Sequence, residues 1–277
     1  MVTAMAAGAL LGPILSTSWS TAATTMRAAS RPNTHKAPAT FPAGIRDLRE
    51  PSGEAPPGPR ALRGYVLTYQ QDFNGRILPS GWGKFTGVPS GNPGSAWAGS
   101  HVLMGGGMVR AVAYRDPRHG NRWITGGLCQ CGPGQGHRYG AYFIRSRVTG
   151  PGPDENELLW PVAHVWPPEI DLNEMGGPAT STSWTVHYGS GYRQVQGTRS
   201  FRMTRWHTWG VIWTPRLLTF TIDGHVWGRV TNVHEIPHQA MTLDIQQETY
   251  CGGGTVYACP THIVALQVDW VAEYRLR

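Results

Sequence analysis

Short runs of alternating apolar and polar residues, separated by Gly, Pro, Asn and Asp, recur from about residue 65 to the end of the chain. No stretch holds an apolar period of 3.6 residues for three helical turns, whereas a period of two predicts strands. The runs expected as strands are residues 65–73, 108–115, 139–148, 157–166, 169–175, 181–189, 207–214, 217–224, 225–233, 241–249 and 262–276. The pattern predicts an antiparallel all-β domain, a sandwich or jelly roll.

One hairpin is specified locally. Asp223 and Gly224 stand between two β-rich runs in the segment TIDGHVWG. Asp-Gly favours the two-residue turn whose central residues both have positive φ, which suits the twist of paired strands. We therefore expect residues 217–224 and 225–233 to pair directly.

Composition sets the domain boundaries. The chain has 277 residues with 36 Gly, 22 Pro and 10% aromatics, and an all-β fold of such size commonly forms one domain. Residues 27–62 mix Pro, Ala, Arg and Gly without apolar periodicity, which predicts a linker or disordered N-terminus. We expect a single jelly-roll domain over residues 63–277.

The first 26 residues have the composition of a targeting segment. The apolar stretch at residues 5–15 is followed by small residues. It is too short to span a bilayer and Pro13 interrupts it. No Lys or Arg precedes the stretch, which departs from the usual signal peptide. These features predict a secreted protein, extracellular or in the cell wall, without membrane insertion.

The net charge of +7 is concentrated near the N-terminus. Residues 1–63 carry seven basic and three acidic side chains, against 17 basic and 14 acidic in the remainder. Because the later part has no dense basic cluster, nucleic acid is not expected as a partner.

Four cysteines, Cys129, Cys131, Cys251 and Cys259, allow three disulfide pairings. The spacing in CGGGTVYAC suggests that Cys251 and Cys259 close a loop. Zinc is the competing interpretation, but these spacings match no common zinc motif.

Three acids are close together in WPPEIDLNEMGG, in a chain with only 15% charged residues. Glu169 and Asp171 share a strand face because side chains alternate. Glu174 would point to the other face unless a β-bulge after Asp171 inserts one residue. Asn173 suits that irregular position. We expect the bulge, and with it three carboxyls on one face.

Neighbouring carboxylates repel, so at least one should bind its proton more tightly than usual. A carboxyl with a raised pKa can act as a general acid while an ionised partner acts as nucleophile, and retaining glycosidases use such a pair. A solvated acidic patch and a Ca²⁺ site are the alternatives. The acids adjoin Trp166 and Pro167, however, and not a Gly/Asp/Asn-rich loop.

The segment EIDLNE resembles the E-x-D-x-x-E motif of glycoside hydrolase family 16, in the bulged form of laminarinase-type enzymes. Further segments resemble that family in the same order, over about residues 65–275: YGAYFIRSRV, LLWPVAHVW, TVHYGSG, WHTWGVIWTPRLLTFTIDG and VDWVAEYR. The resemblance implies a concanavalin-like β-jelly roll of two antiparallel sheets with a concave substrate cleft, and retention of anomeric configuration.

By position in the motif, Glu169 is the expected nucleophile and Glu174 the expected general acid/base. Asp171 is expected between them, hydrogen-bonding the nucleophile. No nucleotide or redox cofactor is expected, since the sequence has neither a phosphate-binding loop nor a dinucleotide-binding turn. The resemblance is compatible with a structural Ca²⁺, whose ligands it does not name.

Aromatic residues near the acids are candidates for sugar binding, because an aromatic face can cover a pyranose ring. Trp160, Trp166 and Trp184 are the candidates, with core packing as the alternative for each. His187 is a candidate donor to a sugar hydroxyl, against a structural role.

The late cleft strand departs from the family, which has a Gly-Gly-rich stretch with an Asn where this chain has TLDIQQETYCGGG. Gln246 is the candidate for the polar sugar contact there, with Gln247 as the alternative.

Together these features predict a monomeric, retaining endo-glycoside hydrolase with a polysaccharide partner. The expected substrate is β-1,3- or mixed-linkage β-glucan, with agar and carrageenan galactans still open. A transglycosylase would use the same residues. The rivals from other classes are a non-catalytic carbohydrate-binding jelly roll and a cell-wall structural protein.

Overall fold

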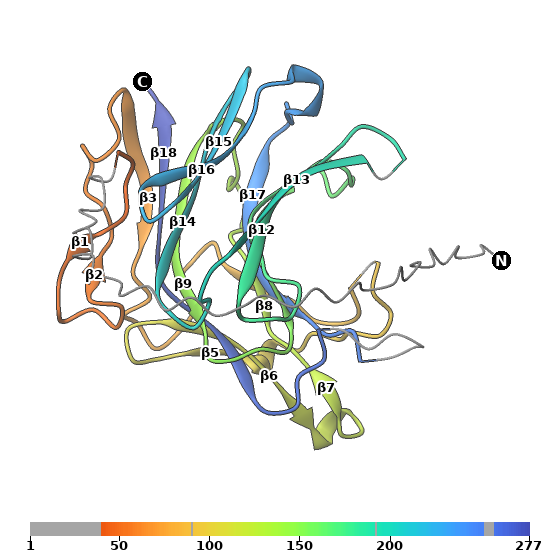
Figure 1. Cartoon of the computed structure of the whole chain (residues 1–277). Coiled ribbons are helices and arrows are strands. Elements are labelled where there is room, and N and C mark those ends of the chain that lie inside the picture. Colours follow the sequence, from red (N-terminus) through yellow and green to blue (C-terminus); the bar gives the residue numbers. More distant parts are fainter. Residues whose placement is uncertain (1–39, 90, 192, 252–257) are drawn as a thin grey trace, which may run out of the picture. The chain divides into compact units, whose positions relative to one another are not determined.

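A computed structural model describes residues 40–89, 91–191, 193–251 and 258–277, which belong to one compact unit. Its strands form two large antiparallel sheets that lie face to face (Figure 1). The seven-stranded sheet has the order β13 (Arg193–Ser200), β12 (Ser181–Tyr188), β11 (Glu169–Glu174), β10 (Asp154–Pro161), β17 (Met241–Glu248), β8 (Gly127–Cys129) and β4 (Gly83–Lys84).

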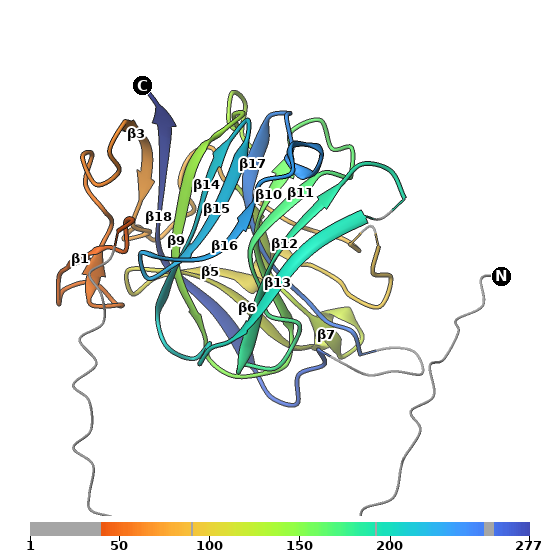
Figure 2. The same cartoon turned by 45° about the horizontal axis from the view of Figure 1, so that its top comes forward.

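The nine-stranded sheet packs on the other side of the core (Figure 2). Its order is β16 (His225–Val230), β15 (Leu217–Ile222), β14 (His207–Thr214), β9 (Gly140–Val148), β18 (Val264–Leu276), β6 (Val109–Asp116) and β5 (Val102–Met104), with β3 (Tyr65–Gln71) on β18 and β7 (Arg122–Ile124) on β6. The remaining elements are short: strands β1 (Ile45–Arg46) and β2 (Glu54–Ala55), and 3-10 helices η1 (Gly99–His101), η2 (Pro117–His119) and η3 (Val233–Glu235).

The core lies between the two sheets and follows the two-residue period of the sequence. On β14, Trp209, Val211 and Trp213 are at most 1% exposed and point inward. They meet Ile170 and Leu243 of the seven-stranded sheet in the same apolar cluster. The all-β sandwich predicted from alternation is therefore confirmed, and apolar burial between the sheets stabilises it.

The Asp-Gly hairpin is confirmed as well. Asp223 has φ of 49° and Gly224 has φ of 74°, and Ile222 pairs with His225 across the turn. The largest boundary difference from expectation is in β10, which begins at Asp154 and ends at Pro161, with residues 162–166 irregular. Strand β13 was not predicted, because most of its residues are exposed and carry no apolar alternation.

Residues 40–62 are not a linker, contrary to the prediction from their composition. Leu62 is buried in a second apolar cluster with Trp270 and Tyr274, on the outer side of the nine-stranded sheet. The hydroxyl of Tyr274 donates to the carbonyl of Pro57, and the indole N–H of Trp270 donates to the carbonyl of Glu54. The segment is rich in proline and glycine and has no regular alternation of apolar residues. It nevertheless covers apolar side chains that would otherwise face water. The targeting segment predicted at residues 1–26 lies outside the described residues.

Two disulfides join Cys129 to Cys131 and Cys251 to Cys259. The pairing expected for the second couple is confirmed, and zinc coordination by the four thiols is ruled out. In the described part of the chain, no helix has the length and apolar character to span a membrane.

Two acidic side chains are buried on the inward face of β10. Glu155 accepts a 2.7 Å hydrogen bond from Gln247, and Glu157 accepts one from Asn173. Both glutamates are 0% exposed. Burial raises the pKa of Glu157 to about 7 and that of Glu155 well above its usual value. Burial therefore favours the protonated form of both carboxyls in the folded protein.

Candidate active site

Strand β11 carries the predicted bulge. Asp171 pairs with Thr185 and Glu174 with Ser183 on β12, so two residues of β11 lie opposite one residue of β12. A bulge of this kind restores the facing of the residue that follows it. The bulge turns Glu174 to the face shared by Glu169 and Asp171.

The side chains on this face can be read from the strand register, because directly paired residues project from the same side of a sheet. Glu169 pairs with His187, and across β10 Asp171 pairs with Leu158 and Glu174 with Asn156. On β17, the partners of Leu158 and Asn156 are Asp244 and Gln246. We call this side of the seven-stranded sheet the acidic face.

Glu169 is held by an indole. Nε1 of Trp166 donates a 2.6 Å hydrogen bond to Oε2 of Glu169. Burial raises the pKa of Glu169 to about 7, and the indole N–H opposes that rise because it stabilises the anion. The two effects leave Glu169 able to ionise near neutral pH.

Asp171 is 2% exposed, and Nε2 of His187 lies 3.6 Å from its Oδ2. Burial raises the pKa of Asp171 well above its usual value, and the negative charges of Glu169 and Glu174 raise it further. A hydrogen bond between the two acids raises the pKa of Asp171 and lowers that of Glu169. This hydrogen bond therefore favours the protonated form of Asp171 and the ionised form of Glu169.

Glu174 has different neighbours. The hydroxyl of Thr185 donates a 2.7 Å hydrogen bond to its Oε2, and the amide of Gln196 approaches the same oxygen at 3.4 Å. Thr185 lies on β12 and Gln196 on β13, whereas the donor to Glu169 precedes β11. The two glutamates therefore share a face but lie in unequal surroundings.

His187 and Trp166 flank the acids, as the sequence suggested. Their ring centroids are 5.4 Å apart, and Nε2 of His187 is 4.0 Å from Oε2 of Glu169. Burial lowers the pKa of His187, so the imidazole is neutral at neutral pH. Trp160, two residues after Leu158 on β10, is half-buried and projects from the acidic face. These three rings are placed to border a ligand beside the carboxyls.

Trp184 does not belong to this group, although it was proposed to bind sugar. It is 7% exposed and points between the sheets, where it stacks on Phe220 at 4.7 Å. Gly197 and Gly228 leave the room that its indole fills. The reason is the register: its neighbours Ser183 and Thr185 face the acids, so Trp184 faces the core.

Gln246, and not Gln247, projects from the acidic face. Gln246 pairs with Asn156 and is half-buried, and its amide lies 3.3 Å from Glu248. Gln247 is fully buried against Glu155.

Three further acids on this face were missed: Asp154, Asp244 and Glu248. Asp154 pairs with Glu248 and accepts a 2.8 Å hydrogen bond from the amide of Gly176. Burial raises the pKa of Asp154 to about 7, with a smaller contribution from the charge of Glu174. The alternation in DENELLW and TLDIQQE could not reveal them, because polar residues occupy both faces of these strands.

No group of three or more His, Cys, Asp or Glu side chains is placed to hold a metal ion among the residues that the structure describes. The carboxyls of the acidic face can themselves donate a proton, attack an electrophile or stabilise a positive charge.

A sequence-family match places the part of the chain that carries the acids among the glycoside hydrolases. Residues 161–271, which include the acids of β11, match the family described as Glycosyl hydrolases family 16. The resemblance to that family predicted from the sequence is thereby confirmed. None of the curated protein sequences matches the chain.

Solved structures share the fold. The laminarinase of Rhodothermus marinus matches with a TM-score of 0.66 and 23% identity, over 77% of this chain and 98% of the other. The laminarinase catalytic domain of Thermotoga maritima matches with 0.65 and 16%, over 77% and 99%. A β-1,3-1,4-glucanase from a mouse hindgut metagenome matches with 0.62 and 19%, over 76% and 99%. At these identities the similarity establishes the jelly roll.

Proposed function

We propose that the protein is a retaining endo-hydrolase of a β-glucan with β-1,3 or mixed β-1,3-1,4 linkages. The main observation in support of this proposal is the bulge in β11, which turns three carboxyls with unequal surroundings to one face. The laminarinases and the lichenase that share the fold support the choice of substrate.

In the proposed reaction, the carboxylate of Glu169 attacks the anomeric carbon while Glu174 protonates the departing glycosidic oxygen. A covalent glycosyl–enzyme ester results. Glu174, now ionised, takes a proton from water as the water attacks the anomeric carbon, and Glu169 leaves as the carboxylate. The product keeps its anomeric configuration because two displacements have occurred.

The raised pKa of Glu169 would by itself suit a general acid. We assign it as the nucleophile because its two neighbours stabilise the anion: the Trp166 indole and the protonated Asp171 both act as donors to it. Asp171 serves as a positioning residue that shares its proton with Glu169. The resemblance to the family motif supports the same assignment.

The neutral His187 and the half-buried Trp160 and Trp166 are proposed to border the sugar in this reaction, with Gln246 as a polar contact further along the face. An aromatic face contributes apolar burial against a pyranose ring, and an amide or imidazole can exchange hydrogen bonds with hydroxyls. We further propose that the protein is exported and acts as a monomer on extracellular polysaccharide. The two disulfides support export, because such bonds persist in oxidising compartments.

The test is a reducing-sugar assay of the full chain on laminarin, lichenan, agarose and κ-carrageenan. We expect release from laminarin or lichenan, and its loss in Glu169→Gln. Glu50→Gln serves as the matched control, since Glu50 lies in the segment that covers the other sheet. Release from the galactans alone would overturn the substrate. Binding without release on all four would favour the non-catalytic jelly roll, and sugar transfer without net release would indicate a transglycosylase.

A further inference from the structure

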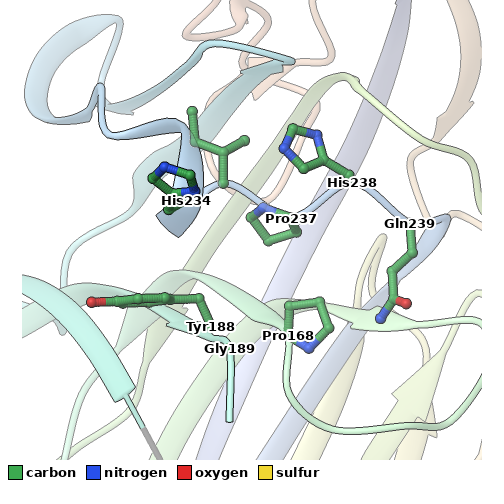
Figure 3. A pocket seen from close by; sticks show the side chains of 8 residues that line it. Pro168, Tyr188, Gly189, His234, Pro237, His238 and Gln239 are labelled. Atoms are coloured by element: carbon green, nitrogen blue, oxygen red, sulfur yellow. The ribbon is translucent and has the colours of Figure 1, made fainter.

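A second concave site lies at the end of the sandwich, away from the acidic face. Figure 3 shows it between the ends of β11 and β12 on one side and the segment that joins β16 to β17 on the other. Its volume is about 360 Å³. The residues that line it are Pro168, Tyr188, Gly189, His234, Ile236, Pro237, His238 and Gln239.

The strand register separates this pocket from the acids. Pro168 precedes Glu169 and Tyr188 follows His187, and Glu169 and His187 are directly paired. Because side chains alternate along β12, Tyr188 projects to the side of the sheet opposite His187 and Glu169. A molecule in the pocket would touch the far side of the strands that carry the acids.

The polar groups of the pocket differ in whether they have hydrogen-bond partners. The hydroxyl of Tyr139 and Nδ1 of His238 share a 2.8 Å hydrogen bond, which orients the His238 ring. Nε2 of Gln239 is buried and has no hydrogen-bond partner within the described part of the chain. A buried amide without a partner is costly, since it has given up its bonds to water. A ligand with an acceptor oxygen would satisfy it.

The lining has no carboxylate, ammonium or guanidinium group. None of the eight residues is Asp, Glu, Lys or Arg, so the pocket offers no counter-charge to a phosphate, a sulfate or a metal ion. Instead it combines the ring faces of Tyr188, Pro168 and Pro237 with the donors and acceptors of two histidines and one amide. Rings beside hydrogen-bonding side chains match a sugar, which has apolar C–H faces and a rim of hydroxyls.

We propose that this pocket is a second, non-catalytic site that binds one or two sugar rings of a neutral polysaccharide. Its volume lies near the lower end of the roughly 300–1,000 Å³ that ligand pockets span, which suits so small a unit. Held there, a polysaccharide stays near the acidic face, and the second contact raises the overall affinity through effective concentration. The inference rests on the proposed function only in the choice of polysaccharides for the test.

The experiment is affinity electrophoresis of the full chain carrying Glu169→Gln, through native gels that contain laminarin, lichenan or κ-carrageenan. Two further substitutions, Tyr188→Ala and His234→Ala, are added singly. We expect each to raise the apparent dissociation constant for a neutral glucan about tenfold, which corresponds to about 1.4 kcal/mol. His234 is exposed, so its variant keeps the test valid even where Tyr188→Ala lowers stability.

His119→Ala is the matched control, because His119 is also an exposed histidine on a 3-10 helix but lies outside the pocket. In the chain with Glu169 intact, both pocket variants should hydrolyse a short aryl glycoside within about twofold of the parent rate. Unchanged retardation in both variants would overturn the proposal. So would an equal loss of retardation and of turnover on the short substrate, because the pocket would then belong to the catalytic cleft. Loss of retardation in a chain that hydrolyses no glycan would support this site while refuting the proposed reaction.

Discussion

The indole of Trp166 donates a 2.6 Å hydrogen bond to the carboxyl of Glu169, three residues further along the chain. The two residues are joined by Pro167 and Pro168, so the donor is delivered from the loop that enters β11. A hydrogen bond to an ionised acceptor is among the stronger ones in proteins. The loop before the strand thus controls the charge of the acid at its start.

Trp166→Phe should move the acidic limb of the pH profile of kcat/KM to higher pH. The indole N–H lowers the pKa of Glu169 from the value that burial alone would give, so its removal lets that pKa rise. The ionised fraction of Glu169 then falls by a larger factor at pH 6 than at pH 8. A shift of up to about one pH unit is expected, since one unit corresponds to about 1.4 kcal/mol.

Trp160→Phe is the control for this shift. Trp160 projects from the same face, but the hydrogen bond to Glu169 comes from Trp166. Its variant should weaken substrate binding and leave the acidic limb where it is. Identical limbs in the Trp166→Phe variant and the parent would show that the indole does not tune Glu169.

Glu174→Ala should separate the two glutamates by role. Without a proton donor, the first displacement slows on polymeric substrates by about 10²-fold or more, but much less on an aryl glycoside whose leaving group needs no proton. Azide should speed the second displacement on that aryl substrate, giving a glycosyl azide of retained configuration, identified by NMR. A β-azide product confirms Glu174 as acid/base. An α-azide would indicate direct attack on the sugar and exchange the roles of Glu169 and Glu174.

Trp184→Ala should unfold the protein more easily, in keeping with a core position. The indole stacks on Phe220 between the sheets, and truncating a buried Trp costs about 3–5 kcal/mol of unfolding free energy. Urea denaturation monitored by circular dichroism measures this loss. Trp160→Ala, on the half-buried face, should cost far less. A fully stable Trp184→Ala variant with weakened glucan binding would return Trp184 to the cleft.

Glu157→Gln should flatten the dependence of stability on pH. The pKa of Glu157 is about 7 in the folded protein against an ordinary value of 4.5. Its effect is nil below about pH 4.5, where both states are protonated. Stability then falls as pH rises toward 7, because the unfolded chain releases the proton first, and stays lower above that pH. The 2.5-unit difference corresponds to about 3 kcal/mol.

Urea unfolding at pH 4.5, 6 and 7.5 tests this expectation. The amide of Gln can still accept the hydrogen bond that Asn173 donates, so the variant removes the titration and keeps the contact. Glu235→Gln, at an exposed 3-10 helix, is the matched control and should retain the full slope. The same slope in both variants would mean that Glu157 does not titrate in this range.

The local features of this structure could be predicted from the sequence. Alternation predicted most long strands, and the count of residues between Asp171 and Glu174 predicted the bulge, because facing follows directly from chain length in a strand. What alternation could not supply was the facing of strands whose two sides are both polar. On β10, Glu155 and Glu157 point into the core while Asp154 and Asn156 point to the acids.

The error on Trp184 has the same origin. Trp184 is near the acids along the chain, as the prediction assumed. The side of the sheet to which it points depends, however, on which residue of β12 lies opposite the bulge. That register is set by the pairing of β11 with β12 and cannot be read from either strand alone. The segment 40–62 was misjudged for another reason. Its contribution comes from single contacts with distant strands, such as that of Pro57 with Tyr274, which leave no periodic trace.

The bulge also determines where β11 could lose one residue without turning the acids to different faces. Removal of either Leu172 or Asn173 would leave a regular strand in which Glu169, Asp171 and Glu174 alternate perfectly and still share a face. Removal of Ile170 would instead turn Glu169 toward the core. The strand therefore has one point at which a single-residue deletion preserves the three acids. Removal of Leu172 would cost a buried core side chain, and removal of Asn173 would cost its hydrogen bond to Glu157.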